Sequence, residues 1–139
     1  MAAPHYLLDT NIVSEMRKIK PHGAVLAWFD ATPADLIQLP AVVLGELQAG
    51  VEKTRRQDPL KAIEIEQWID RILRTWLVQG MDGQAFREWA RIMAGTSDDL
   101  AADAMIAATA RVHGLTVVTR NVKDFKTFGV KVFNPFTGK

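Results

Sequence analysis

Four acidic residues lie at positions where carboxylates could do chemistry together: Asp9, Glu46, Asp103 and Asp124. Asp9 ends a short apolar run, and Asp124 lies five residues after the most strand-like run of the chain. Glu46 and Asp103 lie in the helical segments PAVVLGELQAG and AADAMIAATA, where burial among apolar and small residues disfavours the charged form of a carboxyl. Taken singly, each acid has an ordinary explanation as a helix cap, a turn residue or a solvated side chain.

The four acids together point to a cation. If they converge, their charges repel strongly unless positive charge compensates. Carboxylates with no His or Cys among them are ligands that suit Mg²⁺ or Mn²⁺. The small neighbours of Glu46, which include Gly45, Ala49 and Gly50, suggest that this helix face is pressed against something.

The elements that must position these acids alternate along the chain. Strands are predicted at residues 6–8, 36–39, 76–79, 115–119 and 130–133, with the third one weakly indicated. Helices are predicted at residues 11–19, 22–30, 40–56, 58–75, 83–95 and 100–114. Asp58 and Asp82 are candidate helix caps, Gly114 is a helix stop, and Asp124 is predicted to lie in a polar loop.

Because the predicted strands are continuous apolar runs, they indicate a parallel sheet that is covered on both faces. We therefore predict an α/β fold of three layers, α/β/α, with a central and mostly parallel sheet in a single domain over residues 1–139. Ligands of such sheets bind beyond the carboxyl ends of the strands. Asp9 and Asp124 are expected at that edge.

Composition narrows the function classes. The chain of 139 residues has no cysteine, which excludes disulfides, thiolate metal sites and a cysteine nucleophile. The net charge of +1 is too small to indicate nucleic-acid binding by bulk electrostatics, so local patches would have to do it. No run is long and apolar enough to suggest a membrane helix, and the start does not look like a signal peptide. A cytoplasmic protein is expected.

Four segments in order carry a resemblance to a known family: LLDTNIVS, the Gly-Glu-Leu helix, DAMIAATA and VVTRNVKDF. The chain resembles the PIN-domain ribonucleases, and among them the VapC- and FitB-like toxins of bacterial toxin–antitoxin pairs. The resemblance runs from Tyr6 to about Pro135, and the segment 55–76 is its least specific part. It implies a PIN-like fold in which Asp9, Glu46, Asp103 and Asp124 are the catalytic acids that hold one or two divalent ions.

The resemblance also assigns supporting roles. Asn11, Ser14, Thr119 and Asn121 occupy polar positions beside the acids, where such proteins hold carboxylates or water in place. Glu46 would either bind metal or orient the attacking water. The activity implied is Mg²⁺- or Mn²⁺-dependent endoribonuclease cleavage, in which the ion activates a water and RNA is hydrolysed to a 5′-phosphate and a 3′-hydroxyl.

Partners follow from the same resemblance. The chain would be a toxin bound by a cognate antitoxin, a protein with a DNA-binding N-terminus and a helical tail that places a basic side chain among the acids. A homodimer is also expected from the family. Basic residues near the acids could contact RNA phosphates: Arg17, Lys18, Lys20, Arg120 and Lys123. Ribosomal, transfer and messenger RNA all remain open as targets.

Two other functions stay open on the sequence alone. The opening LLDTN is similar to that of HAD-type phosphatases, but those need a second Asp where this chain has Asn11. A PIN-like RNA-binding or scaffold module without catalysis is the other alternative. An intact set of four acids argues against it, because a scaffold has no need for carboxylates that repel one another.

Overall fold

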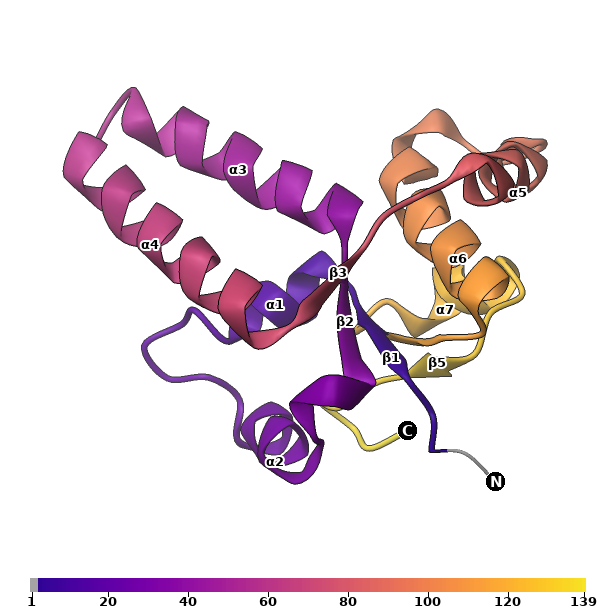
Figure 1. Ribbon diagram of the computed structural model, residues 1–139, viewed down its shortest axis with the longest axis horizontal. Helices are drawn as coiled ribbons and strands as arrows, with labels where there is room; N and C mark the ends of the chain where they lie inside the picture. Colours follow the sequence, from indigo (N-terminus) through magenta and orange to yellow (C-terminus); the bar gives the residue numbers. More distant parts are fainter. Residues whose placement is uncertain (1–2) are drawn as a thin grey trace.

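The computed structural model describes residues 3–139 and has at its centre a five-stranded, wholly parallel sheet with strand order β3-β2-β1-β4-β5 (Figure 1). The strands are β1 (Tyr6–Leu8), β2 (Ile37–Pro40), β3 (Leu77–Gln79), β4 (Thr116–Val118) and β5 (Val132–Phe133). The helices are α1 (Thr10–Glu15), α2 (Gly23–Ala31), α3 (Ala41–Arg55), α4 (Pro59–Thr75), α5 (Gly83–Met93), α6 (Ala101–His113) and α7 (Val122–Thr127). Short 3₁₀ turns at Ala34–Leu36 and Asp98–Leu100 precede β2 and α6.

The helices cover both faces of the sheet, which confirms the predicted three-layer α/β/α fold. In Figure 1, α1 to α4 lie to the left of the sheet and α5 to α7 to the right. Parallel strands are joined by right-handed crossovers, so the change of direction in the strand order moves the later helices to the second face. Helices α3 and α4 pack as one pair and α5 and α6 as another.

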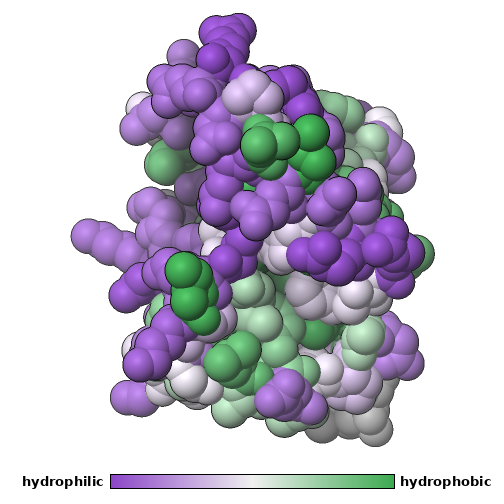
Figure 2. Space-filling model, turned by 90° about the vertical axis from the view of Figure 1, so that its left-hand side faces the viewer, coloured by the Kyte–Doolittle hydropathy of each residue, from purple (hydrophilic) through white to green (hydrophobic). Residues whose placement is uncertain are grey.

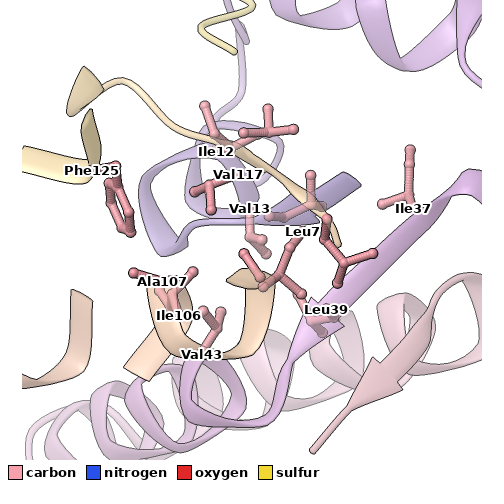
Figure 3. Packing of buried hydrophobic residues seen from close by; sticks show 14 of the residues in the cluster. Leu7, Ile12, Val13, Ile37, Leu39, Val43, Ile106, Ala107, Val117 and Phe125 are labelled. Atoms are coloured by element: carbon pink, nitrogen blue, oxygen red, sulfur yellow. The ribbon is translucent and has the colours of Figure 1, made fainter. Parts of the chain in front are cut away.

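Burial on both faces explains the continuous apolar strands. Leu7, Leu8, Val117 and Val118 have no exposed surface, although successive side chains point to opposite faces. Figure 3 shows strand residues packed with side chains from α1, α3, α6 and α7. In α6 the buried residues are mostly alanines, which allows the helix to lie close to the sheet.

The helix boundaries largely follow the local chemistry of the sequence. The side chains of Asp58 and Asp82 accept hydrogen bonds from the N–H groups of Lys61 (3.1 Å) and Ala85 (2.9 Å), which confirms both predicted caps. Gly114 ends α6 with φ of 66°, in the left-handed region that favours glycine.

Several predicted boundaries are wrong. The segment with Asp124 is a helix, α7, rather than a loop, because Phe125 and Phe128 are both buried at helical spacing. Helix α1 ends at Glu15 instead of reaching Ile19, since the Glu15 carboxylate accepts a bond from the N–H of His22 (2.9 Å) and holds the chain in a turn. Strand β5 has only two residues, and Pro40 closes β2 rather than opening α3.

Figure 2 shows one face as mainly hydrophilic with separate hydrophobic patches. The most exposed large hydrophobic residues are Ile19 and Leu60. No helix within residues 3–139 is long and apolar enough to cross a membrane.

Candidate functional site

The strand order brings four acids to one edge of the sheet. Strands β1 and β4 are neighbours, although most of the chain lies between them, and the order changes direction at this pair. Helices α1, α3 and α7 begin at the carboxyl edge because they follow β1, β2 and β4. Helix α6 also begins there, because its other end leads into the start of β4. This edge is where open parallel sheets bind ligands.

Asp9 lies at the carboxyl end of β1 and is only 5% exposed. Its carboxylate accepts hydrogen bonds from the Thr10 N–H (2.7 Å), the Thr119 hydroxyl (2.8 Å) and the Asn11 amide (3.2 Å). Burial raises the pKa of Asp9, the bonds from Thr119 and Thr10 oppose that rise, and the charge of Glu46 adds to it. Asp9 also caps α1, so the ordinary structural explanation holds as well.

Asp103 is half-buried in the first turn of α6. Burial raises the pKa of Asp103 to about 6, together with the negative charges of Asp9, Glu46 and Asp124. Since charges act on a pKa in this way only at short range, the other three acids each lie near Asp103. The fold therefore gathers the other acids around Asp103.

Glu46 lies in the second turn of α3 and is exposed. Its Oε1 accepts a hydrogen bond from the Thr10 hydroxyl (2.7 Å), which ties α3 to the end of β1. The small residues around it do not press against another element, because a Cβ added at Gly45 or Gly50 would meet nothing within 4 Å. The expectation of a close packing contact was wrong, and the face beside Glu46 is open.

Asp124 lies in the first turn of α7, and a chain of hydrogen bonds joins it to Asp9. The Asn121 amide donates to Asp124 Oδ2 (2.9 Å), and the Asn121 N–H donates to the hydroxyl of Thr119 (2.9 Å), which itself donates to Asp9. Thr119 is fully buried. One hydroxyl thus fixes two segments that are far apart in sequence.

The polar residues predicted beside the acids differ in what they do. Asn11, Thr119 and Asn121 belong to the hydrogen-bond network, whereas Ser14 is exposed on α1 and its hydroxyl makes no hydrogen bond within residues 3–139. Sequence reasoning missed Thr10, whose hydroxyl holds Glu46. The sequence could have indicated Thr10, because it lies between Asp9 and Asn11, directly after a buried strand.

The donors suit a hard divalent cation in their chemistry. All four are carboxylates. Burial is the main cause of the raised pKa of Asp103, and the repulsion from the other acids that adds to it is what a cation would relieve. Within the described residues, however, no three His, Cys, Asp or Glu side chains form a group that could hold an ion together. Hydrogen bonds from Thr10 and Asn121 occupy one oxygen each of Glu46 and Asp124.

Comparison with known proteins gives consistent matches over nearly the whole chain. The PIN domain model matches residues 6–131. VapC ribonuclease Y4jK of Sinorhizobium fredii is 36% identical, over 94% of this chain and 96% of its own length. Toxin FitB of Neisseria gonorrhoeae is 33% identical, over 94% of this chain and 97% of its own. Among solved structures, FitAB bound to an IR36 DNA fragment has a TM-score of 0.73 at 31% identity, covering 94% of this chain and 95% of that one.

Proposed function

The chain belongs to the PIN domain family, and from that membership we propose that it is a metal-dependent endoribonuclease and the toxin of a toxin–antitoxin pair. The observation that carries the proposal is that the strand order brings four carboxylates to one edge of the sheet, where hydrogen bonds through Thr119 and Asn121 link Asp9 to Asp124. Burial and the charges of the other three acids raise the pKa of Asp103 there. Four converging carboxylates are costly for a fold and useful for a site that binds a cation.

In this proposal Asp9, Asp103 and Asp124 hold Mg²⁺ or Mn²⁺, and Glu46 either joins them or orients the attacking water. When bound, the ion polarises a phosphoryl oxygen and makes water a stronger nucleophile at neutral pH. Thr119 and Asn11 orient the Asp9 carboxylate, and Asn121 orients Asp124. Such outer hydrogen bonds fix ligand geometry in metal sites generally.

Glu46 is suited to the water-orienting role because it is exposed beside an open helix face. The Thr10 hydroxyl holds its Oε1, and Oε2 makes no hydrogen bond within residues 3–139. The substrate is RNA, and hydrolysis would leave a 5′-phosphate on one product and a 3′-hydroxyl on the other. A HAD-type phosphatase is disfavoured, because the position that would need a second Asp holds Asn11, which donates to Asp9.

The partners proposed are an antitoxin with a DNA-binding N-terminus and a second copy of this chain. Support for the antitoxin comes from a relative named as a toxin and from the similar FitAB structure, which is bound to a DNA fragment. The acids give such an antitoxin a target, since a basic side chain placed among them would neutralise the same charge as a metal ion.

The test is cleavage of purified total RNA by the wild-type protein with Mg²⁺, with Mn²⁺ and with chelator. Asp9→Asn keeps the shape of the side chain but removes its charge, so cleavage is expected to vanish. Asp70→Asn is the matched control, because Asp70 is an exposed acid in α4 outside the site. RNA cleavage by Asp9→Asn at the wild-type rate would contradict the proposal. Metal binding with no cleavage would favour a binding module without catalysis.

A further inference from the structure

The backbone of Arg120 lies beside the acids, and the proposed chemistry does not use its side chain. Arg120 follows Thr119 directly, and its N–H donates to the Asn11 side chain (3.3 Å). Thr119 and Asn11 both donate to Asp9, so the backbone of Arg120 is fixed at the site from two sides. The next residue, Asn121, donates to Asp124.

The Arg120 guanidinium forms no ion pair within the described residues. Arg55, Arg91 and Arg111, in contrast, each pair with a glutamate. Its charge acts on Glu15, whose pKa is lowered chiefly by the hydrogen bond from Lys18, next by that from the His22 N–H and least by Arg120. Glu15 is already paired with Lys18 at 2.8 Å. The exposed Arg120 side chain is therefore available to an anion.

The Arg120 side chain rests on the ring of Phe136, in the C-terminal segment that follows β5. Its Cζ lies 4.3 Å from the centre of the Phe136 ring, within range of a cation–π contact. The His22 ring lies 5.0 Å from the same ring, and Phe136 is half-buried.

The segment that carries Phe136 is itself fixed. Asn134 is 9% exposed, and its side-chain oxygen accepts a hydrogen bond from the Phe136 N–H (3.0 Å). Its carbonyl accepts bonds from Thr137 (3.2 Å) and Gly138 (2.9 Å). The end of the chain thus forms a tight turn that presents the ring to Arg120.

We propose that the Arg120 guanidinium binds a backbone phosphate of an RNA that lies across the carboxyl edge of the sheet, and that Phe136 is the residue that positions it. This inference rests on the proposed function. A planar guanidinium matches a phosphate with two parallel hydrogen bonds, and a guanidinium already ordered by a ring loses less freedom when it binds. Phe136 follows β5, which is parallel to β4, so its ring and the guanidinium over it lie toward the same carboxyl edge of the sheet as the acids. A phosphate held there would keep the RNA at that edge although the acids themselves repel its backbone.

The test measures binding and cleavage separately. The binding probe is a fluorescent single-stranded RNA pool of random sequence, titrated by anisotropy in chelator at several salt concentrations. Arg120→Ala is expected to weaken binding about 10- to 100-fold and to reduce the slope of log K against log salt by about 0.7, the value for one phosphate contact on a single strand. Lys131→Ala, which removes an exposed charge at the opposite edge of the sheet, is the matched control and leaves both quantities unchanged.

Phe136 is tested with variants that separate its ring from its bulk. Phe136→Leu keeps apolar volume but loses the ring, and we expect binding about 2- to 5-fold weaker. Phe136→Tyr keeps the ring and retains wild-type binding. In an Arg120→Ala background, Phe136→Leu has no further effect, because its role passes through Arg120. In cleavage assays with Mg²⁺, both Arg120→Ala and Phe136→Leu raise KM more than they lower kcat.

Each failure has its own signature. If the wild type cleaves RNA and Arg120→Ala matches it in binding, salt slope and KM, this inference is overturned and the proposed function stands. A Phe136→Leu effect that persists in the Arg120→Ala background overturns the positioning role of Phe136. Binding that depends on Arg120 without any cleavage would refute the nuclease and keep the phosphate contact.

Discussion

At the residue scale, Asp9 combines a structural role with the proposed chemical one. Its side chain accepts from the Thr10 N–H as the cap of α1, and it also accepts from Thr119 across the strand ends. A cap requires only an acceptor oxygen, whereas a metal ligand in this set requires the charge. Asp9→Asn keeps an acceptor oxygen but loses the charge, and Asp9→Ala loses both. Comparing the two variants therefore separates the two roles.

We predict that Asp9→Ala is less stable than Asp9→Asn by about 1 kcal/mol, the usual cost of a lost helix cap. Both variants lose RNA cleavage, because both lack the carboxylate charge. Urea unfolding in chelator measures the difference in free energy of unfolding. Equal stabilities for the two variants would show that the Asp9 cap contributes nothing.

Titration of Asp103 makes the stability of the metal-free protein depend on pH. The pKa of Asp103 is about 6 in the folded chain against 3.8 for the ordinary group, so the folded state holds the proton more tightly than the unfolded state. The contribution of this group to stability is then greatest at low pH, below the ordinary pKa, and falls as pH rises through the folded value. After discount for solvent screening of a half-exposed side chain, the loss is about 1–2 kcal/mol.

We predict that Asp103→Asn no longer loses stability as pH rises and is more stable than the wild type above pH 6 in chelator. Chemical unfolding at a series of pH values from acid to neutral measures it, with Asp70→Asn as the control. A wild-type stability that rises steadily over this range relative to Asp103→Asn would contradict the assigned environment of Asp103.

At the element scale, short helices and strand ends hold the site together. Helix α7 was the element that sequence reasoning predicted least well. Its hydrophobic pattern spans only Phe125 and Phe128, and burial against the rest of the fold decides its conformation. The longer helices with strong caps, such as α4 and α5, were predicted with nearly the observed ends, because Asp58 and Asp82 act locally.

Thr119 joins these elements, and its hydroxyl is the part that matters. Thr119→Val keeps the shape but removes the donor to Asp9 and the acceptor for the Asn121 N–H. We predict a loss of about 1–3 kcal/mol in stability, since an N–H loses its partner in a largely buried place. Metal affinity is expected to fall about 10- to 100-fold. Titration of Mn²⁺ together with urea unfolding checks both, and unchanged metal affinity would exclude Thr119 from the support of the site.

At the scale of the whole molecule, the strand order creates the site. The alternation of apolar strands and helices was enough to predict a parallel sheet with helices on both faces. That alternation does not determine the order β3-β2-β1-β4-β5, because pairing between distant strands depends on the packing of the whole chain. The pattern of the sequence and its resemblance to the PIN family singled out the four acids and also Asn121, which proves to be the partner of Asp124. Thr10, the partner of Glu46, became apparent only from the fold.

The same topology explains why the acids converge without being neighbours in sequence. Asp9 and Asp124 follow adjacent strands, and Glu46 and Asp103 lie in the opening turns of helices that start at the same edge. No local motif contains two of them. Their electrostatic coupling is a property of the assembled sheet, and a cation bound at that edge would offset their repulsion.

Calorimetric titration of the purified protein with Mn²⁺ at neutral pH tests most directly whether this edge of the sheet binds a cation. The wild type and Asp70→Asn are expected to bind the ion alike, and Asp103→Asn is expected to bind it at least about tenfold more weakly, because a charged ligand is lost from a coupled set. Equal Mn²⁺ affinity in the wild type and Asp103→Asn, or no binding by the wild type, would contradict the proposal that the four acids hold a metal ion.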